Sequence, residues 1–553
     1  MAGTWEPLQN QPKFNTSTMF LLSDGRIMVQ EEGTAHWHAL TPDSTGSYVK
    51  GTWSDLADMS FWRRYYASGM LKDGRIIIVG GEQSGDVGDT NKGEIYDPVA
   101  DTWTSIPTPP GWSIVGDAVS CILPDGRLMI GALGDGSCII YNPVTNSWTN
   151  AASKAVRSNE ETWILQRDGT IVTAQCWSPY HAEKYIISSD TWQNEGSPGV
   201  TLVDSTMHEI GPAMLCYNGK TIFFGAAKVQ GVGKTAIYTR PSMPTGVGTW
   251  AAGPDIPQVD KQTMVCNDCP ASLLPNGKVL LTGAQWLDNS WGTPIHFFEY
   301  DPVANTITHV TDPANNNQIL YMSRLMLLPT GQVMFSPSSK EVQVYTPDGG
   351  PEESWRPTIT SVTPHYSNQI FANADYYTLQ GTQLNGLSQA NTYGDDCQPA
   401  TNYPLVRLSG GGKVYYARTY NFSTMGVSTG ASLQSTRFDL SGVPYGTYDL
   451  VVVANGISSH VFSFNYAPAN KPFFVDHGVK REFEFYGKLL VEGDPLNWLQ
   501  WVVDPQIGEL KQQVRQLEKS VQRLTSLIMA RELPQVGREI AEAASQKKQK
   551  TTE

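Results

Sequence analysis

The chain has 553 residues, of which only 17% are charged, and it contains 51 glycines, 16 tryptophans and 24 tyrosines. This composition is typical of β-sheet proteins and excludes a chain that is mainly disordered or mainly coiled coil. The formal net charge of −14 argues against a nucleic-acid or anionic-membrane surface, no apolar run predicts a transmembrane helix, and seven cysteines are too sparse for a disulfide scaffold.

The first strand signal, Gly3-Thr-Trp5-Glu-Pro7, resembles the last strand of a repeat, although no earlier strands precede it. We expect it to pair with strands between Leu325 and Val344 and so to close a ring of sheets. The alternative is an unpaired terminus with a tryptophan there by chance. No basic and apolar leader is readable, which predicts a cytoplasmic protein or one exported without a classical signal peptide.

A turn between two apolar strands then recurs about every fifty residues, which identifies an internal repeat. The second turn residue of its seven copies is Gly25, Gly74, Gly126, Gly169, Gly219, Gly277 and Gly331. Asp-Gly and Asn-Gly favour tight hairpins because both central residues need positive φ. A late aromatic residue, as at Trp103 and Trp148, completes a kelch-type unit of four strands. We therefore predict an all-β fold whose residues 1–355 form a seven-bladed kelch-type β-propeller.

The pattern changes after Trp355. Short alternating strands over residues 356–467 predict an immunoglobulin-like β-sandwich of IPT or E-set type, followed by an aromatic-rich linker over 468–502. Apolar residues at spacings of three and four then predict a coiled-coil oligomerisation helix over 503–530, with a short helix and polar tail over 531–553. The heptad positions are Ile507, Leu510, Val514, Leu517, Val521, Leu524 and Ile528. A parallel dimer is favoured and a trimer is the main variant; the alternative is an amphipathic helix packed on its own domain.

A kelch propeller closed by its own first strand and followed by a sandwich resembles the galactose oxidase and glyoxal oxidase family of copper radical oxidases, over residues 1–467. The resemblance implies one copper held by two tyrosines and two histidines, with a cysteine bonded to one tyrosine. Tyr65, in Arg64-Tyr65-Tyr66, matches the equatorial tyrosine and Tyr321 matches the axial one. Met322, however, stands in the place of the following histidine.

Two further groups of the implied site are missing. No cysteine precedes Cys121, and Asn15 to Thr18 occupy the region that would carry the crosslinking residue. No histidine lies between His365 and His460, where the stretch from Arg418 to Phe422 matches the loop of the last ligand. Copper(II) sites of this kind need imidazole donors. We therefore predict vestigial copper positions at Tyr65, Tyr321 and Met322, no metal, no catalytic residue and no cofactor, with copper only under an oxidase alternative.

Three other motifs are weaker. His36-Trp-His38 places two imidazoles on one strand face without a third ligand, and we interpret them as surface histidines. Cys266 and Cys269 have C-x-x-C spacing without a second pair for zinc, which indicates a loop disulfide or two free thiols. The segment from Gly231 to Lys234 lacks the full spacing of a phosphate-binding loop, which argues against a nucleotide site there.

The residues before each hairpin strand face a funnel at one end of a propeller, where aromatic rings beside a few charges suit a sugar or a polar peptide. The alternative is that these side chains only fill the channel. The candidate ligand-binding residues are Trp62, Arg63, Arg64, Tyr65, Trp112, Glu160, Glu161, His208, Asp268 and Tyr321.

The leading hypothesis is a non-catalytic binding or assembly protein that presents kelch heads on a homo-oligomeric stalk and binds a carbohydrate or protein, with neither nucleic acid nor a membrane span. Whether it is an enzyme stays open. One alternative is a divergent copper radical oxidase acting on alcohols or aldehydes. The other is a structural subunit of a larger particle or fibre.

Overall fold

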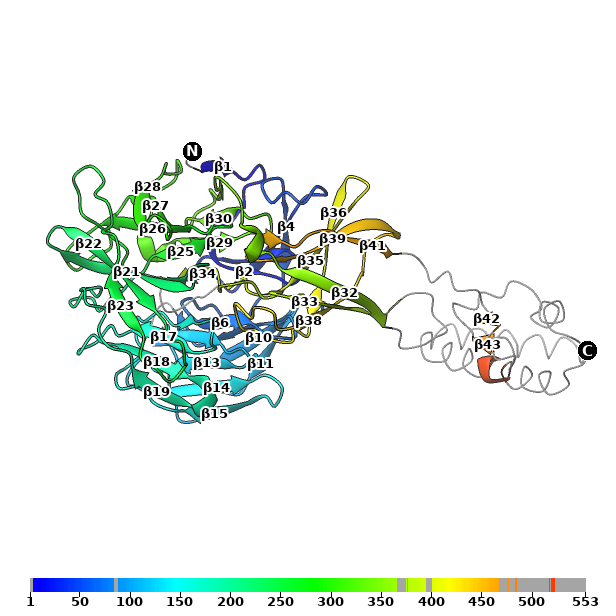
Figure 1. Cartoon of the computed structure of the whole chain (residues 1–553), viewed down its shortest axis with the longest axis horizontal. Coiled ribbons are helices and arrows are strands. Elements are labelled where there is room, and N and C mark those ends of the chain that lie inside the picture. The colour runs from blue at the N-terminus through cyan, green and yellow to red at the C-terminus, as the bar shows by residue number, and fades with distance from the viewer. Residues whose placement is uncertain are drawn as a thin grey trace, which may run out of the picture. The chain divides into compact units, whose positions relative to one another are not determined.

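The computed structural model describes residues 3–83, 88–365, 374, 376–393, 400–466, 475–476, 483–484, 517 and 519–522. Two compact units are separated by their contacts, residues 1–472 and residues 473–553. In its described part the first unit consists of antiparallel strands and three 3-10 turns, η1 (Ile187–Ser189), η2 (Leu320–Met322) and η3 (Glu353–Trp355). The predicted all-β class is confirmed, and the fold is propeller-like (Figure 1).

Seven antiparallel sheets, counted over the described residues, follow the sequence repeat. The first contains β2 (Thr16–Leu21), β3 (Ile27–Glu31), β4 (Trp37–Thr41) and β5 (Thr52–Leu56). The second contains β6 (Ala67–Met70), β7 (Ile76–Val79), β10 (Gly93–Asp97) and β11 (Thr102–Ile106), with the small pair β8 (Glu82–Gln83) and β9 (Gly88–Asp89) beside it. The third contains β12 (Ser120–Ile122), β13 (Leu128–Gly131), β14 (Cys138–Asn142) and β15 (Ser147–Ala151).

The remaining four sheets repeat this order. The fourth contains β16 (Ile164–Leu165), β17 (Ile171–Ala174), β18 (Ala182–Ile186) and β19 (Thr191–Asn194). The fifth contains β20 (Ala213–Leu215), β21 (Lys220–Val229), β22 (Val232–Thr239) and β23 (Thr249–Ala252). The sixth contains β24 (Met264–Val265), β25 (Pro270–Leu273), β26 (Val279–Gln285), β27 (Ile295–Asp301) and β28 (Thr306–His309), and the seventh contains β29 (Arg324–Leu327), β30 (Val333–Ser336) and β31 (Gln343–Thr346).

The hairpins form where the repeat predicts them. Each of the seven repeat glycines has a φ between 80° and 92°, a left-handed conformation that costs other residues strain. The three inner strands of each sheet are almost wholly buried, whereas the outer strand alternates, as in β11 with Trp103 half-buried between exposed neighbours. These outer tryptophans pack on a tyrosine of the adjacent strand, for example Trp103 on Tyr96 with ring centroids 5.2 Å apart.

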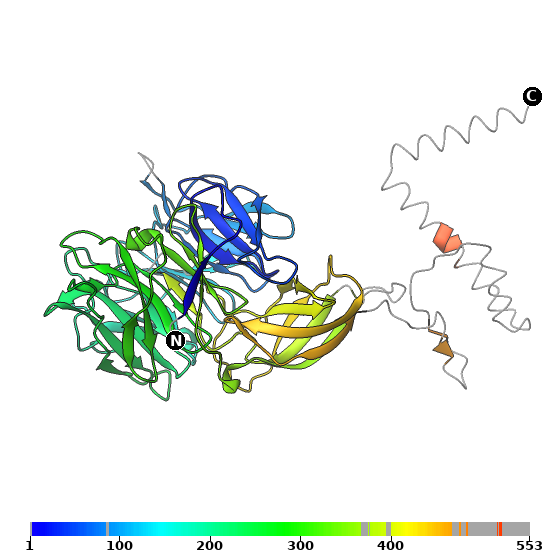
Figure 2. The same ribbon diagram turned by 90° about the horizontal axis from the view of Figure 1, so that it is seen from above.

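The expected closure by the first strand is confirmed. β1 (Thr4–Pro7) pairs antiparallel with β31, with Trp5 opposite Tyr345, and so becomes the outer strand of the seventh sheet. The Trp5 ring contacts Phe297 of the sixth sheet at 4.8 Å and Tyr345 at 4.9 Å between ring centroids. Two ends of the repeat region that are distant in sequence are thus joined by main-chain hydrogen bonds (Figure 2).

Two more antiparallel sheets follow, around a common buried cluster that includes Leu379, Leu408 and Leu450. One consists of β32 (Thr358–His365), β33 (Tyr376–Thr382), β38 (Gln434–Phe438) and β37 (Thr419–Tyr420). The other consists of β36 (Lys413–Ala417), β35 (Leu405–Gly410), β39 (Gly446–Ala454), β40 (Ile457–Ser458) and β41 (Phe462–Tyr466).

One segment between these strands leaves them and enters the ring of seven sheets. β34 (Asn391–Tyr393) pairs with β25, and the Asn391 side chain accepts a hydrogen bond from the Leu327 amide of the seventh sheet at 3.0 Å. Gln389 likewise accepts from the Leu165 amide of the fourth sheet at 3.1 Å. β34 therefore lies among the innermost strands, where Figure 1 labels it.

The match of the stretch from Arg418 to Phe422 to the loop of the last copper ligand is wrong, because that loop would have to reach the end of the ring where Tyr65 and Tyr321 lie. Thr419 and Phe422 donate their amides to Ser23 and Lys72 beside the hairpin turns, so this stretch covers one end of the ring.

In the second unit the described helical residues are 517 and 519–522, and Leu517 and Val521 are 64% and 44% exposed. The other predicted heptad positions lie outside the described residues. So does most of the predicted linker, of which the structure describes the paired strands β42 (Val475–Asp476) and β43 (Phe483–Glu484). Among the residues described, no helix is long and apolar enough to span a membrane.

Candidate functional site

The loops that lead into the innermost strands converge at the end of the ring opposite the hairpin turns. Four residues in them, Tyr65, Glu160, His208 and Asp268, have left-handed φ values of 51°, 64°, 63° and 53°. Such conformations cost non-glycine residues free energy and gather at functional sites. We call the following set the axial site: Arg64, Tyr65, Asp117, Glu160, His208, Glu209, Asp268, Trp291, Tyr321 and Arg324.

Carboxylates from several sheets interact within the axial site. Burial raises the pKa of Asp117 to about 8, with Glu82 and Asp89 adding repulsion. Burial and then the charge of Asp268 raise the pKa of Glu209 well above its usual range. Burial also raises the pKa of Asp268 to about 6, against the opposing effect of Arg324. Near neutral pH the site therefore offers protonated carboxyl groups, which both donate and accept hydrogen bonds.

These pKa shifts predict a stability that falls as pH rises. Between about pH 4 and pH 8 the native Asp117 holds a proton that its unfolded form, with a pKa near 3.9, has released, so folding loses free energy across this window. Asp117→Asn removes this proton binding, so its stability relative to the native chain is expected to rise by about 3–4 kcal/mol from pH 5 to pH 8. Denaturant unfolding of the native chain and of Asp117→Asn at pH 5 and at pH 8 measures this difference in the free energy of unfolding.

The control is Asp288→Asn, because Asp288 lies in an exposed turn. A difference between Asp117→Asn and the native protein that is the same at pH 5 and pH 8 would contradict the assignment.

The two tyrosines singled out in the sequence do meet. The rings of Tyr65 and Tyr321 lie edge to face with centroids 6.2 Å apart, and Trp291 contacts Tyr321 in the same way at 4.8 Å. The Arg324 guanidinium lies 5.8 Å from the Tyr65 ring, and its Nη1 donates to the Tyr321 carbonyl at 2.6 Å. Arg64 covers the Tyr65 ring from 4.6 Å.

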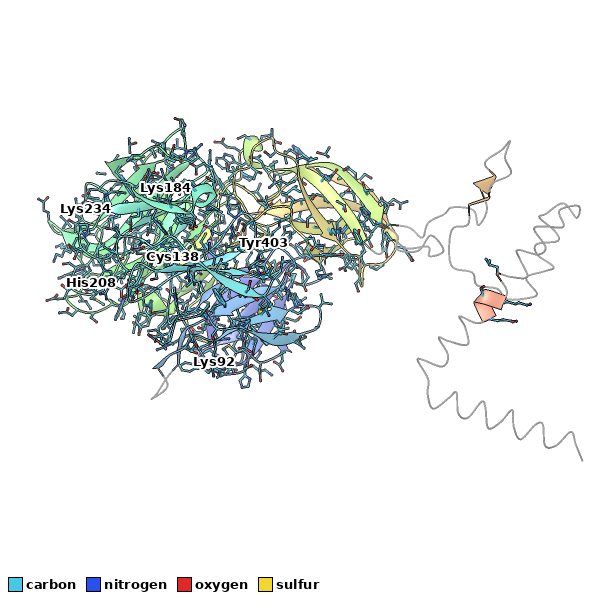
Figure 3. All side chains as sticks on the ribbon, turned by 90° about the horizontal axis from the view of Figure 1, so that it is seen from below. Lys92, Cys138, Lys184, His208, Lys234 and Tyr403 are labelled. Atoms are coloured by element: carbon cyan, nitrogen blue, oxygen red, sulfur yellow. The ribbon has the colours of Figure 1, made fainter. Side chains whose placement is uncertain are left out.

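A second aromatic stack includes His208, whose position Figure 3 labels. Its ring lies parallel to Trp177 with centroids 3.6 Å apart, and the Arg157 guanidinium lies 4.1 Å from Trp177. The axial site thus combines flat ring faces with cationic and carboxyl groups. That combination suits a hydroxyl-rich or peptide ligand.

Two predicted funnel residues are not accessible there. Arg63 is fully buried and pairs with Glu94 at 2.5 Å, while Glu161 is fully buried and pairs with Lys154. Arg63 thus ties the segment before β6 to β10, and Glu161 ties the segment before β16 to the one after β15, so neither offers a ligand a surface. Trp62 and Trp112 are half-buried, and the Trp112 carbonyl accepts from Asn91 at 2.7 Å.

Asp117, Glu209, Trp291 and Arg324 were not identified from the sequence. Arg324 had a usable signal, because it is the single charge in the apolar strand Arg324–Leu327. The others stand in loops with no periodic pattern, so only the fold brings them together.

Among the residues that the structure describes, the donors around Tyr65 and Tyr321 do not fit the copper site that the resemblance implies. Each of the eight described histidines contacts a partner other than these tyrosines. The pairs are His36 with Asp58, His38 with Asp55, His181 with Asn194, His208 with Trp177, His296 and His309 with Asp312, His365 with Thr378, and His460 with Glu353. The segment that carries β34 contains no histidine in its sequence. In the first sheet, the residues from Thr16 to Thr18 are buried strand residues without a thiol.

The weaker motifs separate as follows. His36 pairs with Asp58 at 2.8 Å, and His38 lies between Asp55 and Glu31, so the two imidazoles do not converge. Cys266 and Cys269 are buried free thiols. Gly231 is the turn of the β21–β22 hairpin, with φ of 81°.

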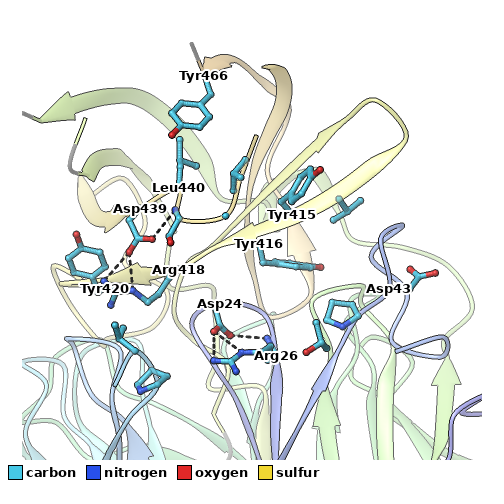
Figure 4. A pocket seen from close by; sticks show the side chains of 18 of the residues that line it. Asp24, Arg26, Asp43, Tyr415, Tyr416, Arg418, Tyr420, Asp439, Leu440 and Tyr466 are labelled. Carbon is cyan, nitrogen blue, oxygen red and sulfur yellow. Dashed lines mark hydrogen bonds and ion pairs between the residues drawn. The ribbon is translucent and has the colours of Figure 1, made fainter. Parts of the chain in front are cut away.

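A separate side cleft of about 850 Å³ lies between the first hairpins and the strands β36 to β39. Figure 4 shows Tyr420 and Tyr466 on one side and the Asp24–Arg26 pair on the other. Arg418 pairs with Asp439 at 3.0 Å and covers the Tyr420 ring. This cleft is a second place where a polar ligand with flat faces could bind.

Comparison with known proteins agrees with this architecture. The Kelch motif family matches residues 63–110. Two galactose oxidases of Gibberella zeae, one of them from strain PH-1, are each 37% identical over 84 residues, which is 15% of this chain and only 12% of the length of these curated relatives. A fungal alcohol oxidase of the AA5 family, solved in complex with copper, superimposes with a TM-score of 0.52 at 15% identity, covering 84% of this chain and 100% of that one. The chain thus carries a Kelch motif and resembles galactose oxidase in part of its sequence and in fold.

Proposed function

We propose that this chain, a galactose oxidase-like protein, is a non-catalytic binding protein. It combines a seven-bladed kelch-type propeller, over residues 1–355 with β34 inserted from the following domain, an immunoglobulin-like sandwich and an oligomerising C-terminal coiled coil. Its ligand is a carbohydrate or a protein held at the axial site, and several heads on one stalk gain avidity for closely spaced targets.

The observation that carries the proposal is the donor set at Tyr65 and Tyr321. The scaffold brings both tyrosine rings together, while Met322 stands where the resemblance implies a histidine, the sequence of the β34 segment has no histidine, and the eight described histidines contact other partners, so among the described residues copper(II) finds no imidazole pair there. A thioether prefers copper(I), and phenols with a pKa near 10 are poor ligands without such partners.

Carbohydrate is the favoured ligand class. The ring faces of Trp291 and Tyr321 offer apolar stacking surfaces, and protonated carboxyls such as Asp117 suit neutral hydroxyl groups better than they suit cations. The exposed Leu517 and Val521, four residues apart on a helix, support the stalk.

The alternative is a divergent copper radical oxidase acting on alcohols or aldehydes, which the partial identity to galactose oxidase favours. A structural subunit of a larger particle or fibre is a third candidate.

One sample of intact chain, exposed to copper and then desalted, separates these functions. We expect well below one copper per chain, no hydrogen peroxide from galactose or benzyl alcohol, and by light scattering a dimer or trimer rather than a large assembly. Stoichiometric copper with peroxide that Tyr65→Phe and Tyr321→Phe abolish would establish the oxidase instead.

On a glycan array the same protein is expected to retain a defined carbohydrate, and Tyr321→Ala is expected to lower that affinity at least about tenfold. Tyr420→Ala, in the side cleft, is the matched control and should bind normally. Loss of binding in Tyr420→Ala alone would move the site to the side cleft.

A further inference from the structure

Two histidines and an aspartate converge on the outer edge of the sixth sheet, away from the axial site. His296 lies in β27, His309 ends β28, and Asp312 follows three residues later. In the β27–β28 register Phe298 lies opposite His309, so His296, two residues before Phe298, is on the same face and diagonal to His309. The hairpin alone therefore places both imidazoles on one surface.

The Asp312 carboxylate lies between the two rings. Its Oδ2 is 2.8 Å from His296 Nδ1, and both of its oxygens are 3.3 Å from His309 Nε2. The Phe297 amide donates to Oδ1 at 2.9 Å, which fixes the carboxylate in this position. One ligand atom from each of the three residues lies within 4.8 Å of the others, and no other such group occurs among the described residues.

This donor set matches zinc chemistry. Zinc takes imidazole nitrogen and carboxylate oxygen at about 2.0–2.2 Å in a tetrahedron, which requires donors about 3.4 Å apart. The two distances from Asp312 to His309 Nε2, 3.3 Å each, already match this spacing, whereas the 2.8 Å contact to His296 Nδ1 must lengthen and the remaining separation, within 4.8 Å, must shorten by side-chain rotation. The side chains of His296, Asp312 and His309 are 15%, 19% and 36% exposed, so solvent reaches the centre of the group and can supply a fourth ligand.

We propose that His296, His309 and Asp312 form a zinc-binding site that locks the closure of the ring. Thr311, the neighbour of Asp312, accepts a hydrogen bond from the Trp5 indole nitrogen at 2.7 Å. A metal held by Asp312 and the two histidines therefore holds the loop on which the closing strand β1 rests. Zinc that binds this folded hairpin and loop stabilises the folded chain by mass action.

The test uses the full chain, stripped with EDTA and titrated with Zn²⁺ by calorimetry and with Co²⁺ by visible absorption. We expect one equivalent that His309→Ala and Asp312→Asn each weaken at least about tenfold. Zinc should also raise the unfolding temperature of the native chain. It should not change the unfolding temperature of Asp312→Asn, a variant that keeps the shape of the side chain.

The matched control is His38→Ala, because His38 also lies between two carboxylates but without a second imidazole. It should bind zinc like the native chain. Zinc affinity that is unchanged in both His309→Ala and Asp312→Asn, or no cobalt absorption at one equivalent, would overturn the proposal, and the axial site would be unaffected by either result.

Discussion

Removing residues 1–7 is expected to destabilise the first unit strongly, because these residues supply the outer strand of the seventh sheet. The deletion exposes the unpaired edge of β31 and removes the Trp5 ring from Phe297, Phe335 and Tyr345. Loss of a packed tryptophan alone costs about 3 kcal/mol or more. Thermal and urea unfolding of the purified protein measure the change.

Trp148→Ala is the matched control for this deletion. Trp148 is also half-buried on an outer strand, and its ring contacts Tyr141 with centroids 5.0 Å apart. Its indole nitrogen donates to the Pro107 carbonyl, which follows the outer strand of the preceding sheet. Unlike β1, however, its strand β15 directly follows its partner strand β14 in the sequence. Its loss should cost less than the deletion, which also removes the closure. Equal effects would mean that β1 only packs a tryptophan and does not hold the ring.

Replacing Lys154 by methionine is expected to cost about 3–5 kcal/mol, the usual result of removing one partner of a buried ion pair. The Lys154 side chain is inaccessible, and its ammonium pairs with Glu161 and lies 3.5 Å from Glu183. Burial raises the pKa of Glu161 and Lys154 lowers it, so the variant strands a carboxylate without a cation. Urea unfolding at pH 7 measures the loss, which should shrink at lower pH as Glu161 takes up a proton.

The pair Lys234–Asp255, with an N–O distance of 2.8 Å and side chains 21% and 48% exposed, supplies the control, and Figure 3 labels its lysine. Lys234→Met should cost less than about 1 kcal/mol, because water screens a surface pair. The double variant Lys154→Met with Glu161→Gln should recover part of the loss. If Lys154→Met and Lys234→Met cost the same, the buried pair is not a stability determinant.

Much of the fold was predictable because its signals are local. Gly74 and Gly126 mark hairpins by needing positive φ, and Trp5 in a strand-like segment without neighbours indicated a strand completing a distant sheet. Tyr65 and Tyr321 were identified through the family resemblance, and both also stand shortly before an innermost strand of the repeat. Arg63 and Glu161 stand in that same region, yet they are buried because they pair with Glu94 of β10 and with Lys154 of the segment after β15.

The path of β34 shows what a local pattern cannot specify. Asn391 lies in a stretch with ordinary sandwich-like spacing, and its insertion depends on hydrogen-bonding groups left open on β25 and at Leu327. The stretch from Arg418 to Phe422 has equally strand-like residues but covers the hairpin turns instead.

The sequence alone determined the repeat, the turns and the closure, because each depends on residue type at a fixed spacing, whereas the prediction that Met322 replaces a histidine ligand came only through the family resemblance. The tertiary structure alone decided which charges are buried, that carboxyls from several sheets raise one another's pKa, and that His296 and His309 meet Asp312. Those properties depend on distances between side chains far apart in the chain, and such distances exist only once the sheets have packed.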